Sequence, residues 1–262
     1  MVPSSGNLVR RLAHAPVVGR VLRWLGSLYR EGSVTTIRYG HAAGLRWRRH
    51  HRYVNGYWLG IYEPDVQAAL ARLVRPGMRV FDIGANAGFF SLVLARLVGP
   101  EGEVIAVDPD PANIESLREQ ATLNPGLRLT AVHAAVGAAT GLGRLQADRP
   151  GSPLAKVAQD ASGEGPLQFL TLDELARTHG SPDLIKMDIE GAEVDSLAGA
   201  AVILGEGSAS WLIETHGLEI GRAVGAILAQ AGYTPRPLDD AARGMEGLRA
   251  ADHVIADMAL RP

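Results

Sequence analysis

The chain has 262 residues, of which 47% are hydrophobic and 21% charged, and this balance excludes an intrinsically disordered protein. Its formal net charge of -2 at pH 7 gives no global attraction to nucleic acid, so no nucleic-acid partner is expected. The absence of cysteine excludes disulfides, thiolate nucleophiles and zinc–cysteine sites, and it fits a reducing, cytoplasmic location.

The first thirty residues predict a basic amphipathic helix, because they contain arginines but no acid and their apolar residues recur at helical spacing over 17–28. We expect this helix to cap the core or to mediate homo-oligomerisation, with peripheral membrane contact through residues 1–30 as the alternative. No apolar run reaches the roughly 20 residues that cross a bilayer. The arginines between Arg46 and Arg52 have two interpretations, attraction of an anionic substrate and a solvated face.

From Pro64 onward, apolar runs alternate with helical patterns, which is typical of a parallel sheet with crossover helices. We therefore divide the chain into an N-terminal extension, 1–56, and one α/β domain, 57–262. Gly-, Pro- and Ser-rich residues between 142 and 169 predict an antiparallel excursion or a long loop. The remaining elements are predicted as strands at 80–83, 104–107 and 127–132, within 182–193, and at 208–217, 233–239 and 252–260, and as helices at 64–75, 89–98, 111–124, 171–179, 192–204 and 222–231.

Polar residues stand at the ends of the predicted strands. In an open parallel sheet, ligands bind at the carboxyl ends of the strands, near the point where the strand order reverses. The sequence therefore predicts one ligand site built from the residues in which four strands end. These residues are Gly84, Asn86 and Gly88 in the turn after the first strand, Asp108 at the end of the second, Asp188 and Glu190 at the end of the fourth, and Glu214 and His216 at the end of the fifth.

The turn VFDIGANAG indicates which ligand this site holds. It lacks the second glycine of the dinucleotide fingerprint G-x-G-x-x-G, which counts against a nicotinamide-dependent oxidoreductase. Asp82, beside the turn, would repel a pyrophosphate but accept hydrogen bonds from an ammonium group. Asp108 follows the turn by about twenty residues, the distance at which an acid reaches ribose hydroxyls. A ribose, an adenine and a cationic amino acid together describe S-adenosylmethionine.

Several sequence blocks occur in an order and at a spacing typical of a known family. They are YWLGIYEPDVQAAL, VFDIGANAGFFSLVLARLVGPEGEVIAVDPDPANIESL, AVHAAVG, LTLDEL, DLIKMDIEGAEVDSLAGA and WLIETHG, from Tyr57 through His216. In these blocks the chain resembles the FkbM-like methyltransferases. The resemblance implies a class I methyltransferase (Rossmann-like) fold, with a seven-stranded, mostly parallel sheet, helices on both faces and an antiparallel last strand.

The same resemblance implies S-adenosylmethionine-dependent O-methylation of a hydroxyl of a sugar, a polyketide or another small or glycosylated metabolite. Family members commonly have glutamate where this chain has Asp108. The cofactor-binding residues that it implies are Glu63, Asp82, Gly84, Asn86, Gly88 and Asp108. Asp188, at the same edge of the predicted sheet, is predicted to bind the cofactor with them. Glu63 has stabilisation of a helix terminus as an equally good interpretation.

Methyl transfer from a sulfonium needs little covalent machinery, so the protein must hold the acceptor oxygen and help to remove its proton. His216 is predicted as the general base because imidazole titrates near neutral pH. Asp188, Glu190 and Glu214 are its catalytic rivals or partners. Alternatively, Asp188, Glu214 and His216, with Glu190 nearby, hold Mg²⁺ or Mn²⁺. A non-catalytic nucleotide-binding protein that docks through its basic N-terminus is the rival from another class.

Overall fold

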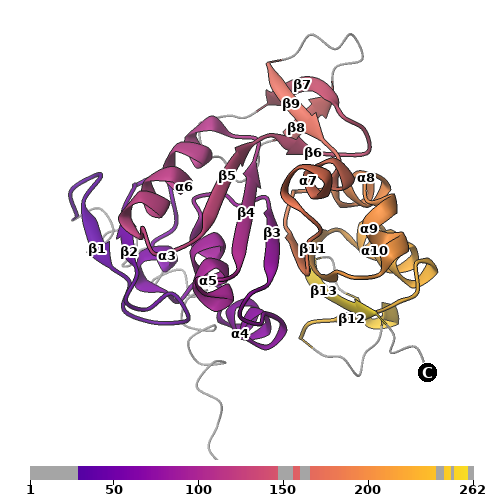
Figure 1. Ribbon diagram of the computed structural model, residues 1–262, viewed down its shortest axis with the longest axis horizontal. Helices are drawn as coiled ribbons and strands as arrows, with labels where there is room; N and C mark the ends of the chain where they lie inside the picture. The colour runs from indigo at the N-terminus through magenta and orange to yellow at the C-terminus, as the bar shows by residue number, and fades with distance from the viewer. Residues whose placement is uncertain (1–28, 147–155, 160–165, 240–244, 249–250, 259–262) are drawn as a thin grey trace, which may run out of the picture.

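The central sheet has seven strands in the order β12-β13-β11-β10-β3-β4-β5 (Figure 1). In chain order they are β3 (Arg79–Ile83), β4 (Glu103–Asp108), β5 (Leu129–His133), β10 (Leu184–Met187), β11 (Ser210–His216), β12 (Tyr233–Pro237) and β13 (Ala251–Met258). β13 pairs antiparallel with β11 and β12, whereas the other neighbouring pairs are parallel. The predicted class I sheet with its antiparallel last strand is confirmed. Because the chain runs outward from β3 to β5 and then returns to β10, the strand order reverses between β3 and β10.

The structure, a computed structural model, describes residues 29–146, 156–159, 166–239, 245–248 and 251–258. The apolar stripe of the predicted basic helix, 17–28, lies outside these ranges. Within them, no helix combines the length and the apolar character that crossing a membrane requires.

Helices cover both faces of the sheet because successive strand residues point to opposite sides. Val80 packs with one hydrophobic cluster and its neighbour Phe81 with another. The helices on the Val80 side are α4 (Pro64–Leu73), α5 (Phe89–Val98) and α6 (Pro111–Leu123). Those on the Phe81 side are α7 (Leu172–His179), α8 (Glu193–Ala198), α9 (Ala201–Glu206) and α10 (Leu218–Gln230), and a short 3₁₀ helix, η2 (Met245–Gly247), precedes β13.

The region between 192 and 204 differs from its prediction as a single helix. It forms two helices, α8 and α9, which separate at Gly199. A Cβ at Gly199 would lie 2.3 Å from the carbonyl oxygen of Gly137, so the backbone passes too close for a side chain. The carboxylate of Asp173 accepts hydrogen bonds from the amides of Val202 and Ile203, which satisfies the new helix start.

The antiparallel excursion predicted within 142–169 is a second, four-stranded sheet in the order β6-β9-β7-β8. Its strands are β6 (Ala135–Val136), β7 (Gly141–Gln146), β8 (Lys156–Gln159) and β9 (Leu167–Leu170). β7 pairs antiparallel with both β8 and β9.

Residues 29–57, here called the strap, precede α4 and pack along α6. They contain β1 (Val34–Thr36) and β2 (Arg46–Arg48), which pair antiparallel, and lead into α3 (Gly56–Leu59). Ile37 and Trp47 are fully buried and belong to the same hydrophobic cluster as Phe89 of α5. The division of the chain at residue 56 stays a prediction, but these residues share their core with the sheet domain.

The outer edge of β2 is paired by side chains of α6 instead of by another strand. The carboxamide of Asn124 accepts from the amide of Arg46 and donates to its carbonyl, both at 2.8 Å. Gln120 makes the same two bonds with Arg48, at 2.8 and 3.1 Å. Both side chains reach their strand partners because Gln120 and Asn124 are four residues apart at the end of a helix and Arg46 and Arg48 are two apart on a strand, spacings that both correspond to about 6–7 Å.

Replacing Gln120 with leucine should lower the free energy of unfolding by about 2–4 kcal/mol, because the N–H and C=O of Arg48 each lose a partner. Urea unfolding followed by circular dichroism measures the change. Glu115→Leu, at an exposed position of the same helix, is the control, with an expected change of less than about 0.5 kcal/mol. Equal stability of Gln120→Leu and wild type would show that water replaces the carboxamide without cost.

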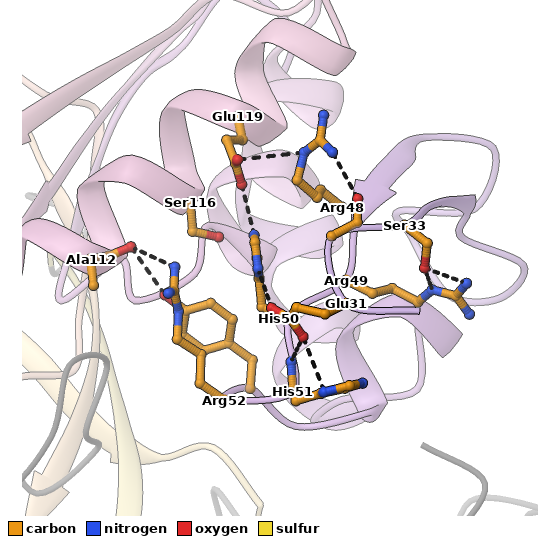
Figure 2. A network of polar contacts seen from close by, with 12 residues as sticks. Glu31, Ser33, Arg48, Arg49, His50, His51, Arg52, Ala112, Ser116 and Glu119 are labelled. Atoms are coloured by element: carbon orange, nitrogen blue, oxygen red, sulfur yellow. Dashed lines mark hydrogen bonds and ion pairs between the residues drawn. The ribbon is translucent and has the colours of Figure 1, made fainter. Parts of the chain in front are cut away.

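Charged side chains add further contacts between the strap and α6 (Figure 2). His50 lies between Glu31 and Glu119, with nitrogen–oxygen distances of 2.8 and 2.7 Å. Arg48 pairs with Glu119 at 3.5 Å, and Arg52 donates to the carbonyl of Ala112. The contacts of His50, Arg48 and Arg52 therefore attach the strap to the domain. The two interpretations of the arginines, a solvated face and an anion site, do not describe these contacts fully.

Candidate active site

A cavity of about 550 Å³ opens at the carboxyl ends of the strands, where the strand order reverses. Its volume lies within the roughly 300–1,000 Å³ that is typical of small-molecule sites. The strap and the small sheet also reach it, through Val54 and Tyr57 on one side and Val157 of β8 on another. Of the predicted site residues, the cavity is lined by Gly84, Asn86, Asp108, Asp188 and Glu190.

The turn after β3 has the close backbone approach that its small residues predict. A Cβ on Gly84 would lie 1.8 Å from the carbonyl oxygen of Asp188, and one on Gly88 would lie 2.5 Å from Leu117. Both glycines have positive φ, and so does Asn86 between them, at 48°. Glycine is therefore required at both positions, and the backbone of β3 reaches that of β10 at the cavity floor.

Asp108 is held in place by three hydrogen-bond donors. Its Oδ1 accepts from the amide of Asp110 at 2.9 Å and from Nδ2 of Asn113 at 3.0 Å, and its Oδ2 accepts from the amide of Asn86 at 2.8 Å. Burial raises the pKa of Asp108 to about 6, although these three bonds oppose the shift. Oδ2 keeps the greater free capacity to accept, which suits a hydroxyl donor in the cavity.

Asp82 lies beneath the cavity, where it pairs with a lysine on the neighbouring strand. Its register partner on β10 is Lys186, whose Nζ is 3.5 Å from Oδ1 of Asp82 and 3.6 Å from Oδ2 of Asp188. Ser91 donates to the other oxygen of Asp82 at 2.6 Å, but Oδ1 has no hydrogen-bond partner among the described residues. Asp82 is thus a support for the cavity floor, and its contact with a cofactor stays a prediction.

Lys186 lines the cavity but was missing from the predicted site. It is only 4% exposed, and its Nζ lies 5.1 Å from the centre of the Phe90 ring. Burial alone would lower its pKa, but Asp82 and Asp188 outweigh burial and raise it, so the ammonium stays charged. A lysine inside the apolar run LIKM was a usable signal, because lysine is almost never fully buried without a charged partner.

A second cross-strand pair lies beside the cavity, between β11 and β13. Glu214 and His253 are register partners, with Nε2 of His253 3.3 Å from Glu214 and 3.9 Å from Glu63. Burial opposes protonation of His253, but Glu214 and Glu63 outweigh it and raise the pKa. Sequence reasoning missed His253, which is 39 positions beyond Glu214 in the chain and meets it only through sheet pairing.

His216 is surrounded by three carboxylates. Nδ1 lies 2.6 Å from Oε1 of Glu193, which is fully buried, and Nε2 lies 3.5 Å from Glu190 and 3.7 Å from Asp188. The hydrogen bond to Glu193 is the largest of the effects that raise the pKa of His216 to about 9. The ring is therefore charged at neutral pH, and Glu193, which was missing from the predicted site, fixes its orientation.

The other predicted residues lie around these groups. Glu63 begins α4 and Glu214 lies within β11, both beside the cavity and outside its lining. Asp188, Glu214 and His216 offer ligand atoms that all lie within 4.8 Å of one another, and the same holds for Glu63, Glu214 and His253.

Backbone strain is concentrated at this site. The three non-glycine residues with positive φ in the described part of the chain are Glu63 at 40°, Asn86 at 48° and Glu190 at 52°. Each lies at or beside the cavity, so the fold holds these side chains at some conformational cost.

The residues present fit S-adenosylmethionine. Gly84 brings the backbone of the turn to the cavity wall, Asp108 presents a fixed acceptor, and Lys186 holds a buried ammonium between Asp82 and Asp188. Aromatic rings add an apolar wall, in which Tyr57 stacks on Phe89 at 5.3 Å between centroids. Acceptors, a buried cation and an aromatic wall are what a ribose and a zwitterionic, sulfonium-bearing amino acid need.

Comparison with known proteins agrees with this fit. A family model described as methyltransferase FkbM domain matches residues 82–234. Over 77 residues the chain is 36% identical to carboxy-S-adenosyl-L-methionine synthase of Trichlorobacter lovleyi, a match that covers 29% of this chain and 31% of that protein. It is also 42% identical over 66 residues to arsenite methyltransferase of Halobacterium salinarum, covering 25% and 16% of the two chains. The matches thus span less than a third of these curated relatives.

Among solved structures, the chain is similar to an FkbM methyltransferase from Methylobacillus flagellatus, with a TM-score of 0.48 and 16% identity. That similarity covers 78% of this chain and 56% of the other.

Proposed function

The chain belongs to the FkbM methyltransferase family, and from this premise we propose that it transfers the methyl group of S-adenosylmethionine to a hydroxyl of a sugar, a polyketide or another small or glycosylated metabolite. The observation that carries the proposal is the imidazole of His216, which Glu193 orients next to two residues of the cavity lining, Asp188 and Glu190. A hydroxyl acceptor must lose a proton, and an oriented imidazole takes one. The family and the turn both count against the oxidoreductase alternative.

Each group at the site has a role in this proposal. S-adenosylmethionine, when bound, supplies a methyl group on a sulfonium that is already a good leaving group. Asp108 binds the ribose hydroxyls, while Lys186 and Asp188 provide opposite charges for the methionine end. In its neutral form, whose fraction grows as the pH approaches about 9, Nε2 of His216 takes the proton of the acceptor oxygen, and Glu193 holds Nδ1 so that the ring cannot turn away.

A divalent metal on Asp188, Glu214 and His216 remains the alternative way to activate the hydroxyl. We favour the base because these carboxylates already have cationic neighbours. Lys186 lies 3.6 Å from Asp188, and His253 lies 3.3 Å from Glu214.

Cofactor affinity should fall as the pH is lowered through about 6, the pKa of Asp108 in the free protein. The ionised carboxylate accepts hydrogen bonds from ribose hydroxyls better than the protonated one, so affinity is full above this pKa and decreases by up to about tenfold per pH unit below it. Isothermal titration with S-adenosylhomocysteine between pH 5 and 8 measures the effect. Asp108→Asn should bind more weakly at pH 8 and lose this pH dependence. A wild-type protein that does not bind S-adenosylhomocysteine at any of these pH values would overturn the proposed function.

The acceptor can be tested by a direct search. The protein is incubated with methyl-labelled S-adenosylmethionine and a panel of glycosides, polyketides and amines, and each product is analysed by mass spectrometry and by the position of its label. The proposal expects a label on oxygen. Label on nitrogen or carbon alone would reject O-methylation while leaving the cofactor assignment intact.

A further inference from the structure

Tyr53 of the strap is connected to the cofactor site by hydrogen bonds. Beyond β2, the strap continues along α6 to Tyr53, whose hydroxyl donates to Oδ1 of Asn113 at 2.9 Å and lies 3.3 Å from the carbonyl of Ala112. Arg52 also donates to that carbonyl (Figure 2). The next residue, Val54, lines the cavity, so Tyr53 joins the attached part of the strap to the part that closes the site.

Asn113 connects this hydroxyl to Asp108. Its Nδ2 donates to Oδ1 of Asp108 at 3.0 Å, while its Oδ1 accepts from Tyr53. An ionised carboxylate can only accept, so the amine end of the carboxamide must face Asp108 and its oxygen must face the tyrosine. Burial raises the pKa of the Tyr53 hydroxyl, which therefore keeps its proton and acts as the donor. Each group in the chain from Tyr53 to Asp108 thus has one defined direction.

The contact from Asn113 is the adjustable one among the three that hold Asp108. The other two donors are the backbone amides of Asn86 and Asp110, which the turn and the start of α6 fix. Asn113 is a side chain, 4% exposed, and without Tyr53 its buried oxygen would lose its side-chain donor. A rotated carboxamide would bring an oxygen toward the carboxylate of Asp108 and would turn Oδ2 away from its direction in the cavity.

We infer that Tyr53 is a positioning residue for cofactor binding. Through Asn113 it sets the orientation of Asp108 toward the ribose. The strap is therefore part of the cofactor site, although it precedes the residues that match the family model. The inference rests on the proposed function, because it requires a ligand with ribose hydroxyls. It assigns to a residue of the strap an effect on Asp108, which is two side chains away in the chain of hydrogen bonds.

The test is Tyr53→Phe, which removes the hydroxyl and keeps the ring. We expect affinity for S-adenosylhomocysteine to fall about three- to tenfold, the effect of one buried hydrogen bond. Affinity for adenosine should fall by the same factor, and affinity for 2′,3′-dideoxyadenosine should not change, because the effect passes through the ribose hydroxyls. The midpoint of the pH dependence should also move upward, since Asp108 loses a donor to its charged form. Tyr39→Phe, at an exposed position of the strap, is the matched control and should bind like wild type.

A second variant distinguishes the positioning of Asp108 from a general loss of rigidity around the site. Asn113→Ala should weaken binding on its own but add little to Tyr53→Phe, because both break the same chain of bonds. The inference would be overturned by additive losses in the double variant, by equal losses for adenosine and its dideoxy analogue, or by unchanged affinity in Tyr53→Phe. Each of these outcomes would leave the cofactor assignment intact, because wild type still binds S-adenosylhomocysteine. Absence of wild-type binding would overturn the proposed function and this inference with it.

Discussion

Replacing Lys186 with methionine should lower the free energy of unfolding by about 3–5 kcal/mol, because it leaves the carboxylate of Asp82 buried without a counter-charge. Asp82 is fully buried, and among the described residues its Oδ1 has no partner other than the ammonium 3.5 Å away. Methionine has nearly the length of lysine, so the loss of stability measures the missing charge more than a change in packing. Because the pKa of Lys186 is raised, the ammonium stays charged up to at least about pH 10, and urea unfolding at pH 7, where carboxylates are also ionised, measures the contribution of the pair.

A double-mutant cycle identifies the cause of that loss. Asp82→Asn removes the unpaired charge, so the double variant with Lys186→Met should recover a large part of the lost stability. The control is Arg79→Met, which breaks a half-exposed pair with Glu103 at the opposite end of β3 and should cost no more than about 1 kcal/mol. If Lys186→Met and Arg79→Met cost the same, the buried pair is not what holds β3 to β10.

Removing the imidazole of His216 should affect turnover and leave cofactor binding intact. His216→Gln should reduce kcat by about 10²–10⁴-fold, the usual contribution of a general base. Affinity for S-adenosylhomocysteine should stay within about twofold, because His216 lies outside the cavity lining. Only the neutral ring accepts a proton, and its pKa is about 9, so wild-type kcat should rise about tenfold per pH unit up to that value and then level off.

Glu193→Gln tests the origin of this profile. Glu193 is the main cause of the raised pKa of His216, so its neutral analogue should shift the midpoint to lower pH. A flat pH profile together with unchanged kcat in His216→Gln would transfer the role of base to Asp188 or Glu190. Loss of activity in EDTA that Mg²⁺ or Mn²⁺ restores would instead favour the metal alternative on Asp188, Glu214 and His216.

Local sequence patterns predicted most of the sheet and the turn. A buried strand, small residues and a helix follow each other in VFDIGANAG, and each has a signal that does not depend on distant residues. Asp108 was found for the same reason, because its distance from the turn follows from one βαβ unit.

The missed residues are those whose roles depend on pairing between strands. Lys186 faces Asp82 across β10 and β3, and His253 faces Glu214 across β13 and β11, over separations that no local pattern encodes. Glu193 was missed for a related reason. An acid in the first turn of a helix has a local explanation, and only the fold brings His216, at the end of β11, within hydrogen-bond distance of it.

The strained backbone at Glu63, Asn86 and Glu190 lowers the stability of the protein at positions whose side chains lie at or beside the cavity. Glycine would relax a left-handed position by roughly 1–2 kcal/mol, so a search for stabilising substitutions would select the two glutamates early. Each such change would also remove a carboxylate at or beside the cavity. Under the proposed function, a more stable protein and a less active one are therefore reached by the same substitutions.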